Sequence, residues 1–143
     1  MQKTVATILR DKGADVWTID PEATVYQALE LMAQRNVGAV VVVEEDTLVG
    51  IISERDYARK VVLLDRVSKK TSVSEIMTAD VVTVTSLAGV DHCMSLMTDR
   101  RIRHLPVVDE GRLVGLVSIG DVVRAMIAER EFMIEQLEQY IQS

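Results

Sequence analysis

The chain has 143 residues, 48% of them hydrophobic, which is enough for one ordinary domain or for two small halves that share a core. Its 16 basic and 22 acidic residues give a net charge of -6, and this charge disfavours nonspecific binding to nucleic acids or anionic membranes. No apolar run approaches the roughly 20 residues that span a bilayer, and the apolar patch near the N-terminus is too short for a signal peptide. We therefore expect a cytoplasmic protein whose partners are small molecules or other proteins.

The single cysteine, Cys93, cannot form an internal disulfide. Val90, Met94 and Met97 share an apolar helical face with it. We predict that Cys93 packs in the core and has no redox role.

Most of the chain is a tandem repeat with a constant offset of 65 residues. Residues 14–62 and 79–127 are identical at 18 of 49 aligned positions without a gap, and Gly50 aligns with Gly115. Two copies of one supersecondary unit usually complete each other's core, because neither buries its apolar face alone. The repeat therefore predicts two similar halves.

Each copy has the predicted order β-α-β-β-α. In the first copy, Thr24 opens a helix whose buried face carries Val25, Ala28, Leu29 and Met32 at helical spacing. The expected strands are Val16–Ile19, Gly38–Val43 and Leu48–Ile52, and a second helix runs from Glu54 to Leu63. In the second copy the expected strands are Val81–Val84, His104–Val108 and Arg112–Val117, with a helix over Gly89–Arg100.

Each copy follows a short apolar helical segment, Val5–Leu9 or Val73–Met77, and residues 10–13 form a connector that is three residues longer than its counterpart. We divide the chain into repeat 1 (residues 5–63), a polar linker (64–72), repeat 2 (73–127) and a C-terminal helical extension (128–143). The expected fold class is α/β (α+β), with the two repeats packed about a pseudo-twofold axis.

The C-terminal extension carries an apolar stripe without a counterpart in the first copy. Its members are Met126, Met133, Ile134, Leu137, Tyr140 and Ile141, near a heptad spacing. The stripe is explained equally well by packing against its own domain and by a seam for self-association.

One motif ends the last strand of each copy: Ser53-Glu54-Arg55-Asp56 and Ser118-Ile119-Gly120-Asp121. A helix start offers unpaired N–H groups to an anion such as phosphate, and an ionised Asp can accept hydrogen bonds from both hydroxyls of a ribose. The same spacing is also close to a capping box, which satisfies the helix start without any ligand. Recurrence of the motif within a larger repeat favours a nucleotide site.

The two motifs, together with Leu105-Pro106-Val107-Val108-Asp109 before the second hairpin, make the chain resemble a tandem pair of cystathionine-β-synthase (CBS) domains, or Bateman module, of the stand-alone type. The resemblance covers about residues 5–127. It implies two clefts between the repeats that bind adenosine-containing molecules such as AMP, ADP, ATP, NAD or S-adenosylmethionine. It also implies a homodimer, because related modules pair into a disc.

The resemblance assigns roles to particular positions of each copy. Asp56 and Asp121 match ribose-holding acids, and Ser53 and Ser118 match hydroxyl residues beside ribose and phosphate. Thr18 and Thr83 match first-strand positions that reach the base or its ribose. The adenine pocket would be lined by Asn36, Val37, Gly38 and Ala39 in copy one and by Arg101, Ile102, Arg103 and His104 in copy two. Copy one departs from the pattern, since Ala39-Val40-Val41-Val42 replaces the His104-Leu105-Pro106-Val107 of copy two.

Basic side chains near these positions favour a phosphate-bearing ligand over a sulfonium, because guanidinium groups suit phosphate. They are Arg55, Arg59, Arg101, Arg103 and His104. His104 itself precedes a strand edge and a proline, a setting in which a structural role is commoner. We find no catalytic constellation, glycine-rich phosphate loop or metal-ligand spacing, so we expect neither an enzyme nor a metal requirement.

Three functions remain in competition. The leading hypothesis is a regulatory sensor of energy or redox state that binds AMP, ADP, ATP or NAD and signals to an unidentified protein. The second is an interaction or dimerisation scaffold with empty clefts, and the third is an enzyme acting on a nucleotide.

Overall fold

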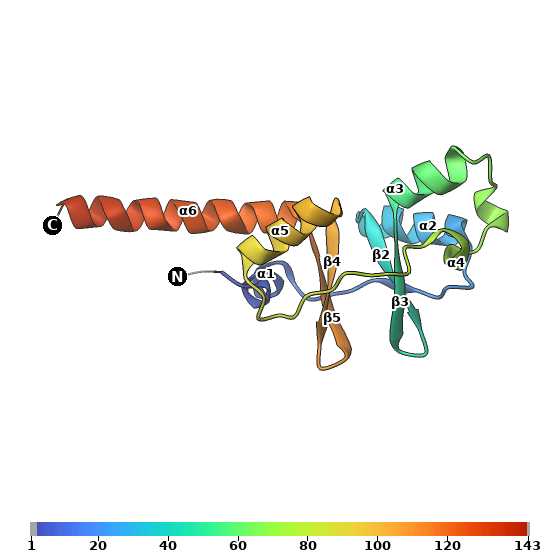
Figure 1. Cartoon of the computed structure of the whole chain (residues 1–143), viewed down its shortest axis with the longest axis horizontal. Helices are drawn as coiled ribbons and strands as arrows, with labels where there is room; N and C mark the ends of the chain where they lie inside the picture. Colours follow the sequence, from blue (N-terminus) through green and yellow to red (C-terminus); the bar gives the residue numbers. More distant parts are fainter. Residues whose placement is uncertain (1–2, 143) are drawn as a thin grey trace. The chain divides into compact units, whose positions relative to one another are not determined.

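The computed structural model describes residues 3–142 and divides the chain into two compact units. We call Val16–Val82 the first-repeat unit, and we call the residues up to Asp15 together with those from Thr83 onward the second-repeat unit. Both units combine helices with strands (Figure 1), which confirms the expected α+β class.

The first-repeat unit contains a three-stranded sheet of order β1-β2-β3. β1 runs parallel to β2, whereas β2 and β3 form an antiparallel hairpin that pairs Ala39 with Ser53. Glu45 and Asp46 have positive φ angles of 49° and 64°, as a tight hairpin turn requires. The elements are β1 (Thr18–Ile19), α2 (Val25–Arg35), β2 (Ala39–Glu44), β3 (Thr47–Ser53), α3 (Glu54–Tyr57), the π-helical turn η1 (Ala58–Val62), the 3-10 turn η2 (Ser68–Lys70) and α4 (Val73–Ile76).

The second-repeat unit is built around the antiparallel hairpin of β4 and β5, which pairs His104 with Ser118. Its elements are α1 (Val5–Lys12), α5 (Val90–Arg100), β4 (His104–Asp109), β5 (Arg112–Ser118) and α6 (Ile119–Gln142). The capping interactions anticipated from sequence occur in the first-repeat unit, where Thr24 and Gln27 form a capping box at the start of α2.

Apolar side chains from helices and strands fill both cores. In the first-repeat unit, the predicted face of α2 packs with the inner residues of the sheet, and Val25, Ala28, Val40 and Ile52 are fully buried. In the second-repeat unit, Cys93 is completely buried, which confirms its predicted place in the core. Burial raises the pKa of the Cys93 thiol.

The helix that opens each repeat packs in the unit of the other repeat. α1 opens repeat 1 yet belongs to the second-repeat unit, where the Val5 N–H donates to Ala88 O (2.9 Å) and the Val90 N–H donates to Lys3 O (3.0 Å). α4 opens repeat 2 yet lies in the first-repeat unit, where the Val25 N–H donates to Thr71 O (2.8 Å). The compact units therefore divide the chain differently from the sequence repeats.

Gly115 and Gly50, the aligned glycines of the two copies, lie where these exchanged segments contact the hairpins. A Cβ on Gly115 would lie 2.6 Å from Leu9 Cδ2 of α1, and a Cβ on Gly50 would lie 2.5 Å from Met77 Sδ and 3.0 Å from Thr78 O. All three distances are below ordinary van der Waals contact. The repeated glycine thus permits the close approach of each exchanged segment.

We predict that Gly115→Ala lowers the free energy of unfolding by about 1 to 3 kcal/mol, the usual cost of overpacking. The added methyl group would push against Leu9, which is almost fully buried. Urea denaturation of Gly115→Ala, Leu9→Ala and the double variant forms a mutant cycle, in which Leu9→Ala relieves part of the overpacking. Strictly additive effects would contradict this account.

The expected strand Val81–Val84 is wrong, because only Val84 pairs, through an isolated bridge to Val107. In the first-repeat unit the Val41 N–H donates to Trp17 O (3.2 Å) and so joins β1 to β2. The aligned position in the second copy is Pro106, which has no N–H to donate. Proline therefore removes one ladder bond and shortens the pairing to a single bridge.

Three helices differ from expectation. α1 continues to Lys12, so most of the predicted connector over residues 10–13 is helical. The expected helix Glu54–Leu63 is one α-helical turn followed by the π-helical turn η1. The C-terminal extension is one helix with the preceding residues, since α6 runs unbroken over 24 residues. None of the described helices has both the length and the apolar character needed to cross a bilayer.

Candidate functional site

Ser53 and Asp56 lie together at the start of α3 in the first-repeat unit. The Asp56 N–H donates to Ser53 Oγ (3.2 Å), and the Ser53 N–H and hydroxyl donate to Asp56 Oδ2 (3.0 and 3.1 Å). This is the capping box weighed as the ligand-free explanation of the motif. Asp56 Oδ1 lies 3.4 Å from Lys60 Nζ, so one carboxylate oxygen caps the helix and the other faces a cation.

The loop before β2 is tied to the same helix start. The Glu54 N–H donates to Gly38 O (3.0 Å), and Ala39 pairs with Ser53 across the hairpin. Asn36 ends α2 in the left-handed conformation with φ of 54°, which Asn tolerates well. The predicted base-lining segment and the predicted ribose-phosphate motif are therefore neighbours in space.

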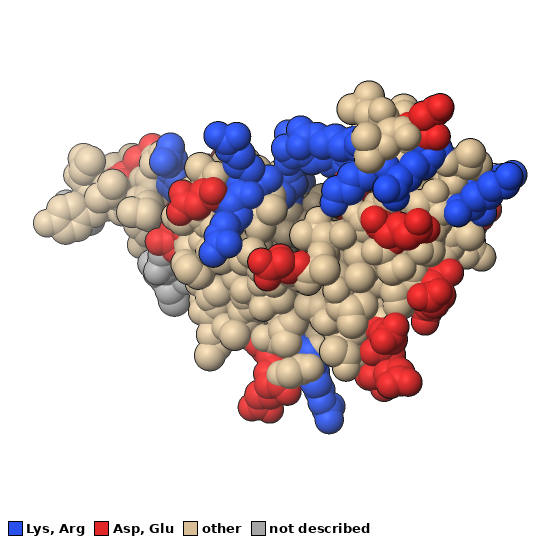
Figure 2. Space-filling model, turned by 45° about the vertical axis from the view of Figure 1, so that its right-hand side comes forward, with Lys and Arg blue, Asp and Glu red and all other residues tan. Residues whose placement is uncertain are grey.

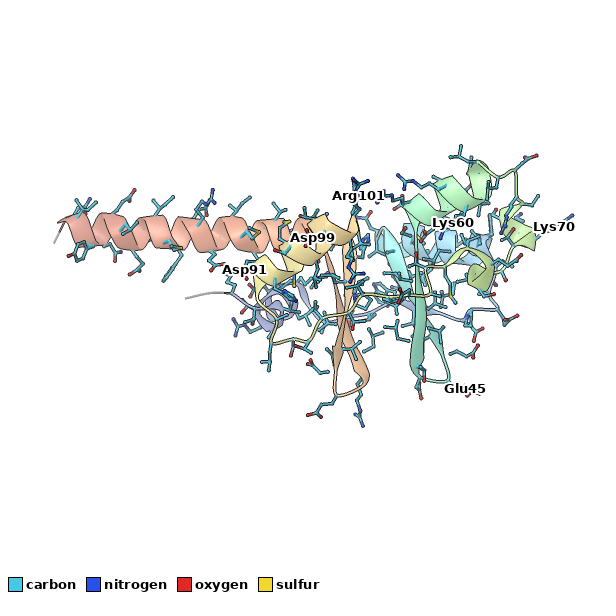
Figure 3. All side chains as sticks on the ribbon, viewed as in Figure 1. Glu45, Lys60, Lys70, Asp91, Asp99 and Arg101 are labelled. Carbon is cyan, nitrogen blue, oxygen red and sulfur yellow. The ribbon has the colours of Figure 1, made fainter. Side chains whose placement is uncertain are left out.

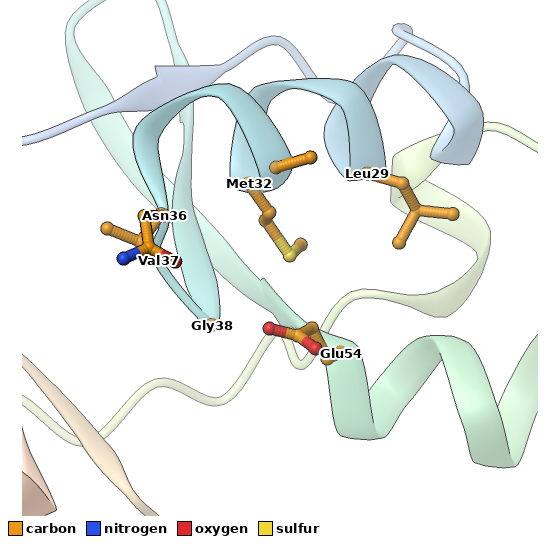
Figure 4. A pocket seen from close by; sticks show the side chains of 7 residues that line it. Leu29, Met32, Asn36, Val37, Gly38 and Glu54 are labelled. Carbon is orange, nitrogen blue, oxygen red and sulfur yellow. The ribbon is translucent and has the colours of Figure 1, made fainter.

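A pocket of about 300 Å³ opens beside this loop. Figure 4 shows its lining, which comes from α2, the loop after it and the start of α3; the residues are Leu29, Met32, Ala33, Asn36, Val37, Gly38 and Glu54. Asn36, Val37 and Gly38 were predicted to line an adenine pocket, whereas Ala39 is buried in β2 and does not line this one. Ser53 and Asp56 also lie outside the lining, one residue and two residues from Glu54.

The remaining predicted residues of the first-repeat unit are exposed. Thr18 lies on β1, opposite Val41 of β2. Arg55 lies in α3, between the two members of the capping box.

Within the described part of the chain, the carboxylate of Asp121 in the second-repeat unit contacts two cations, whereas that of Asp56 contacts one. Its Oδ2 accepts from the Ser118 N–H (2.9 Å) and from Lys12 Nζ (2.7 Å), while its Oδ1 accepts from Arg124 (2.7 Å). The Asp121 N–H donates to Ser118 Oγ (3.2 Å), which completes the same kind of cap. Asp121 is only 7% exposed, so α1 supplies a cation to a nearly buried carboxylate at the start of α6.

The surroundings of Asp121 favour its charged form, and those of His104 favour the neutral imidazole. Burial alone would raise the pKa of Asp121, but hydrogen bonds from Lys12 and Ser118 outweigh burial and hold that pKa below its ordinary value. Burial is the largest effect on His104 and lowers its pKa, with Lys12 and Arg103 acting in the same direction and Asp121 opposing them. At neutral pH the imidazole is therefore uncharged.

The loop before β4 is hydrogen-bonded to the start of α6, just as the loop before β2 is hydrogen-bonded to the start of α3. The Ile119 N–H donates to Arg103 O (2.8 Å), and His104 pairs with Ser118. Arg101, labelled in Figure 3, ends α5 in the left-handed conformation with φ of 55°. Ile102 lies between these arginines in the loop, half-buried, and its N–H donates to Met97 O (3.1 Å).

Thr83 lies beside the β4–β5 hairpin, near Pro106. The Val84 N–H donates to Pro106 O (3.1 Å), so the exposed Thr83 adjoins the middle of β4. The loops before β2 and β4 thus meet the helix starts of α3 and α6, whereas Thr18 and Thr83 lie further along the hairpins, beside Val41 and Pro106.

Sequence reasoning missed the cations that contact the two carboxylates. Arg124 aligns with Arg59 at the repeat offset, so the repeat contained a signal for it. Lys60 lies one turn after Asp56, an ordinary helical pairing. Lys12 had no sequence signal, because it comes from a helix more than a hundred residues away in the chain.

The two units therefore present the same backbone framework with different charges. Around Asp121 the cations Lys12 and Arg124 make short ion pairs, whereas Lys60 approaches Asp56 less closely. Carboxylate, hydroxyl and helix-start N–H groups can bind a diol and an anion. Within residues 3–142, no cluster of His, Cys, Asp and Glu has the composition of a metal site.

Comparisons with known proteins agree with this framework. The family model for the CBS domain matches residues 5–63 and 73–128. The chain is 46% identical to the mitochondrial CBS domain-containing protein CBSX3 of Arabidopsis thaliana, over 97% of this chain and 72% of that protein. It is also similar to the structure of a putative signal-transduction protein with CBS domains from Burkholderia ambifaria, with 52% identity, a TM-score of 0.85, and coverage of 88% of this chain and 95% of that one.

A third match is a structure with bound ligands. The CBS domain pair of protein MJ0100, in complex with 5'-methylthioadenosine and S-adenosyl-L-methionine, is 29% identical with a TM-score of 0.80. The match covers 90% of this chain and 99% of that one.

Proposed function

Because the chain belongs to the CBS domain family and carries two CBS domains in tandem, we propose that it is a regulatory module that binds AMP, ADP, ATP or NAD. Binding of the nucleotide would change the affinity of the module for a regulated partner protein. Such signalling requires that the nucleotide bind two states of the module with different affinities.

One observation carries this proposal: in both units the loop before the middle strand is hydrogen-bonded to the start of the Ser-x-x-Asp helix. Gly38 O and Arg103 O accept the bonds, from Glu54 and Ile119 respectively. These bonds support the proposal, because they join the loop expected to line the base to the helix start whose carboxylate is expected to hold ribose.

The charges in the second-repeat unit support a phosphate-bearing ligand. Lys12, Arg101, Arg103 and Arg124 all belong to the cluster around Asp121 or to the loop bonded to it. The MJ0100 pair holds adenosine derivatives without phosphate. We propose that these cations shift the preference of the present chain from such ligands to nucleotides.

A thermal-shift series with AMP, ADP, ATP, NAD, S-adenosylmethionine, 5'-methylthioadenosine and adenosine tests this function. A ligand at a hundred times its Kd stabilises the native state by about 2.7 kcal/mol, so a true ligand raises the Tm measurably. We expect larger shifts with the phosphate-bearing nucleotides than with the other three compounds. Equal shifts with all of them would contradict the phosphate preference.

Two other functions give different results in the same samples. An interaction scaffold with empty sites would show no shift with any compound at millimolar concentration. An enzyme would consume the nucleotide, whereas we expect chromatography to recover it intact after long incubation.

We also propose that the module is a homodimer, because α6 exposes several large apolar side chains. Sedimentation equilibrium of the full chain is expected to give twice 15.9 kDa at micromolar concentration. Truncation after Ala128 removes the exposed part of α6 and is expected to weaken the dimer. A monomeric full chain would refute this prediction, and Gln142→Ala, a change within α6 that removes no apolar group, is the control.

The identity of the regulated partner and the cytoplasmic location stay predictions. The relative CBSX3 is mitochondrial, so membership of the family does not fix the compartment. Fractionation of cells that express the tagged full chain tests the location.

A further inference from the structure

The outer part of α6 is exposed to solvent. The buried residues of α6 are near its start, at Asp121, Val122 and Ala125, whereas every residue from 130 to 142 is exposed. Figure 1 shows α6 extending past α5 and the β4–β5 hairpin. We call residues 129–142 the α6 tail.

The α6 tail is apolar as well as exposed. Leu137 is 60% exposed and Ile141 79%; the other large apolar side chains are Phe132, Met133, Ile134 and Tyr140. A lone helix of this length is marginally stable in water, and so much exposed apolar surface marks an interaction site. The packing explanation of the sequence stripe therefore fails for the tail.

A second exposed apolar surface lies in the first-repeat unit, over η1 and the loop that follows it. We call residues 59–70 the basic segment. Leu63 is 75% exposed, and the other exposed apolar side chains of the segment are Val62, Leu64 and Val67. Leu64 and Val67 of this patch belong to the linker (residues 64–72) that was predicted to be polar.

Basic side chains surround this patch. Figure 2 shows Lys and Arg gathered on the side that carries α3 and η1, and Figure 3 labels Lys60 and Lys70 there. Lys60 Nζ donates to Ile76 O (3.0 Å), and Lys69 Nζ lies 4.7 Å from the centre of the Tyr26 ring, so the unit holds two of the cations in place.

The two surfaces carry opposite charges. The α6 tail has four acidic residues (Glu129, Glu131, Glu135, Glu138) against Arg130, a net charge of -3. The basic segment has five cations (Arg59, Lys60, Arg66, Lys69, Lys70) against Asp65, a net charge of +4 within residues 59–70, and Asp56 next to Lys60 lowers the local charge to +3. Attraction therefore favours a contact between tail and segment, whereas two α6 tails side by side would bring like charges together.

We propose that the α6 tail docks on the basic segment of a second copy of this chain. The inference rests on the proposed homodimer and names the surfaces that form it. A twofold axis makes the contact twice, tail of each copy on segment of the other, and so covers both apolar surfaces with one symmetry operation.

Charge reversal in the full chain tests this pairing. The tail variant is Glu135→Lys with Glu138→Lys, which changes the net charge of the tail from -3 to +1, and the segment variant is Arg66→Glu with Lys69→Glu and Lys70→Glu, which changes that of the segment from +4 to -2. All five side chains are exposed. Each variant alone is expected to weaken the dimer by about tenfold or more in sedimentation equilibrium, because it places like charges in contact. Glu44→Lys, an exposed reversal at the end of β2, is the matched control and is expected to leave the dimer unchanged.

Recombination makes the test specific. An equimolar mixture of tail and segment variants is expected to form heterodimers, because both contacts then join opposite charges. A chain that carries all five substitutions is expected to regain the homodimer, which also shows that the variants fold.

Other arrangements predict other results. A seam between two α6 tails would be strengthened by the tail variant, and that result would overturn the proposal. A parent dimer unaffected by either variant would also overturn it while leaving the homodimer intact. A monomeric parent would refute the homodimer itself.

Discussion

Asp121→Ala is expected to weaken AMP binding by about 1.5 to 3 kcal/mol, the range for hydrogen bonds to a charged group. This corresponds to roughly a ten- to a hundredfold rise in Kd. The low pKa of Asp121 keeps the carboxylate ionised at neutral pH, so it can accept from ribose hydroxyls once Lys12 or Arg124 gives way. Asp56→Ala is expected to weaken binding over the same range.

Asp121→Ala and Asp56→Ala are expected to differ in the free energy of unfolding. Asp121→Ala leaves the Ser118 N–H without its side-chain acceptor and removes the ion pairs with Lys12 and Arg124 from a nearly buried carboxylate, whereas Asp56 is more exposed. We therefore expect the larger loss of unfolding free energy with Asp121→Ala. Calorimetry with AMP and urea denaturation measure the two effects, and Asp99→Ala, an exposed acid of α5 in Figure 3, is the control. Unchanged affinity with lowered stability would limit Asp121 to capping and ion pairing.

Replacing Arg101 and Arg103 is expected to abolish most of the preference for AMP over adenosine. Each charge-assisted contact to phosphate contributes about 1.5 to 3 kcal/mol, and adenosine does not make it. The preferred variant is Arg101→Asn with Arg103→Ala, because Asn36 holds the aligned left-handed position in repeat 1 and Asn avoids backbone strain.

Calorimetry with AMP and adenosine at low and at physiological salt measures this preference. AMP binding by the parent is expected to weaken as salt rises, and adenosine binding is expected to stay nearly constant in parent and variant alike. Arg112→Ala removes an exposed charge at the end of the β4–β5 hairpin and serves as the control. A variant that still discriminates as the parent does would assign phosphate to the Ser53 or Ser118 helix starts alone.

The constant repeat offset was the most informative feature of the sequence. It predicted both hairpins and the interior helix of each copy, because Thr24, Ser53 and the buried face of α2 are local signals that the structure obeys. The resemblance to CBS domains grouped the loops expected to line the base with the Ser-x-x-Asp motifs. The backbone bonds of Glu54 and Ile119 show that these segments are neighbours.

Features that depend on distant partners were not predictable in the same way. Lys12 reaches Asp121 only because α1 packs in the second-repeat unit, and no local pattern reports that exchange. The shortened pairing at Val84 had a local cause, the missing N–H of Pro106, but its effect depends on which strand lies beside it. Capping boxes could be read from spacing, whereas the cations that engage their carboxylates could not.

The exchange of the opening helices has a consequence for synthesis on the ribosome. The first-repeat unit is one unbroken stretch, Val16–Val82, so all of its contacts become available once α4 has emerged. α1 is made before that stretch, but its partners, residues 86–90, β5 and the start of α6, are all made after it, and domains generally fold as units during synthesis. The nascent chain must therefore carry α1 undocked, with Val5 and Ile8 uncovered, while the first-repeat unit folds. The order of folding thus reverses the order of the two helices, since α4 docks before α1.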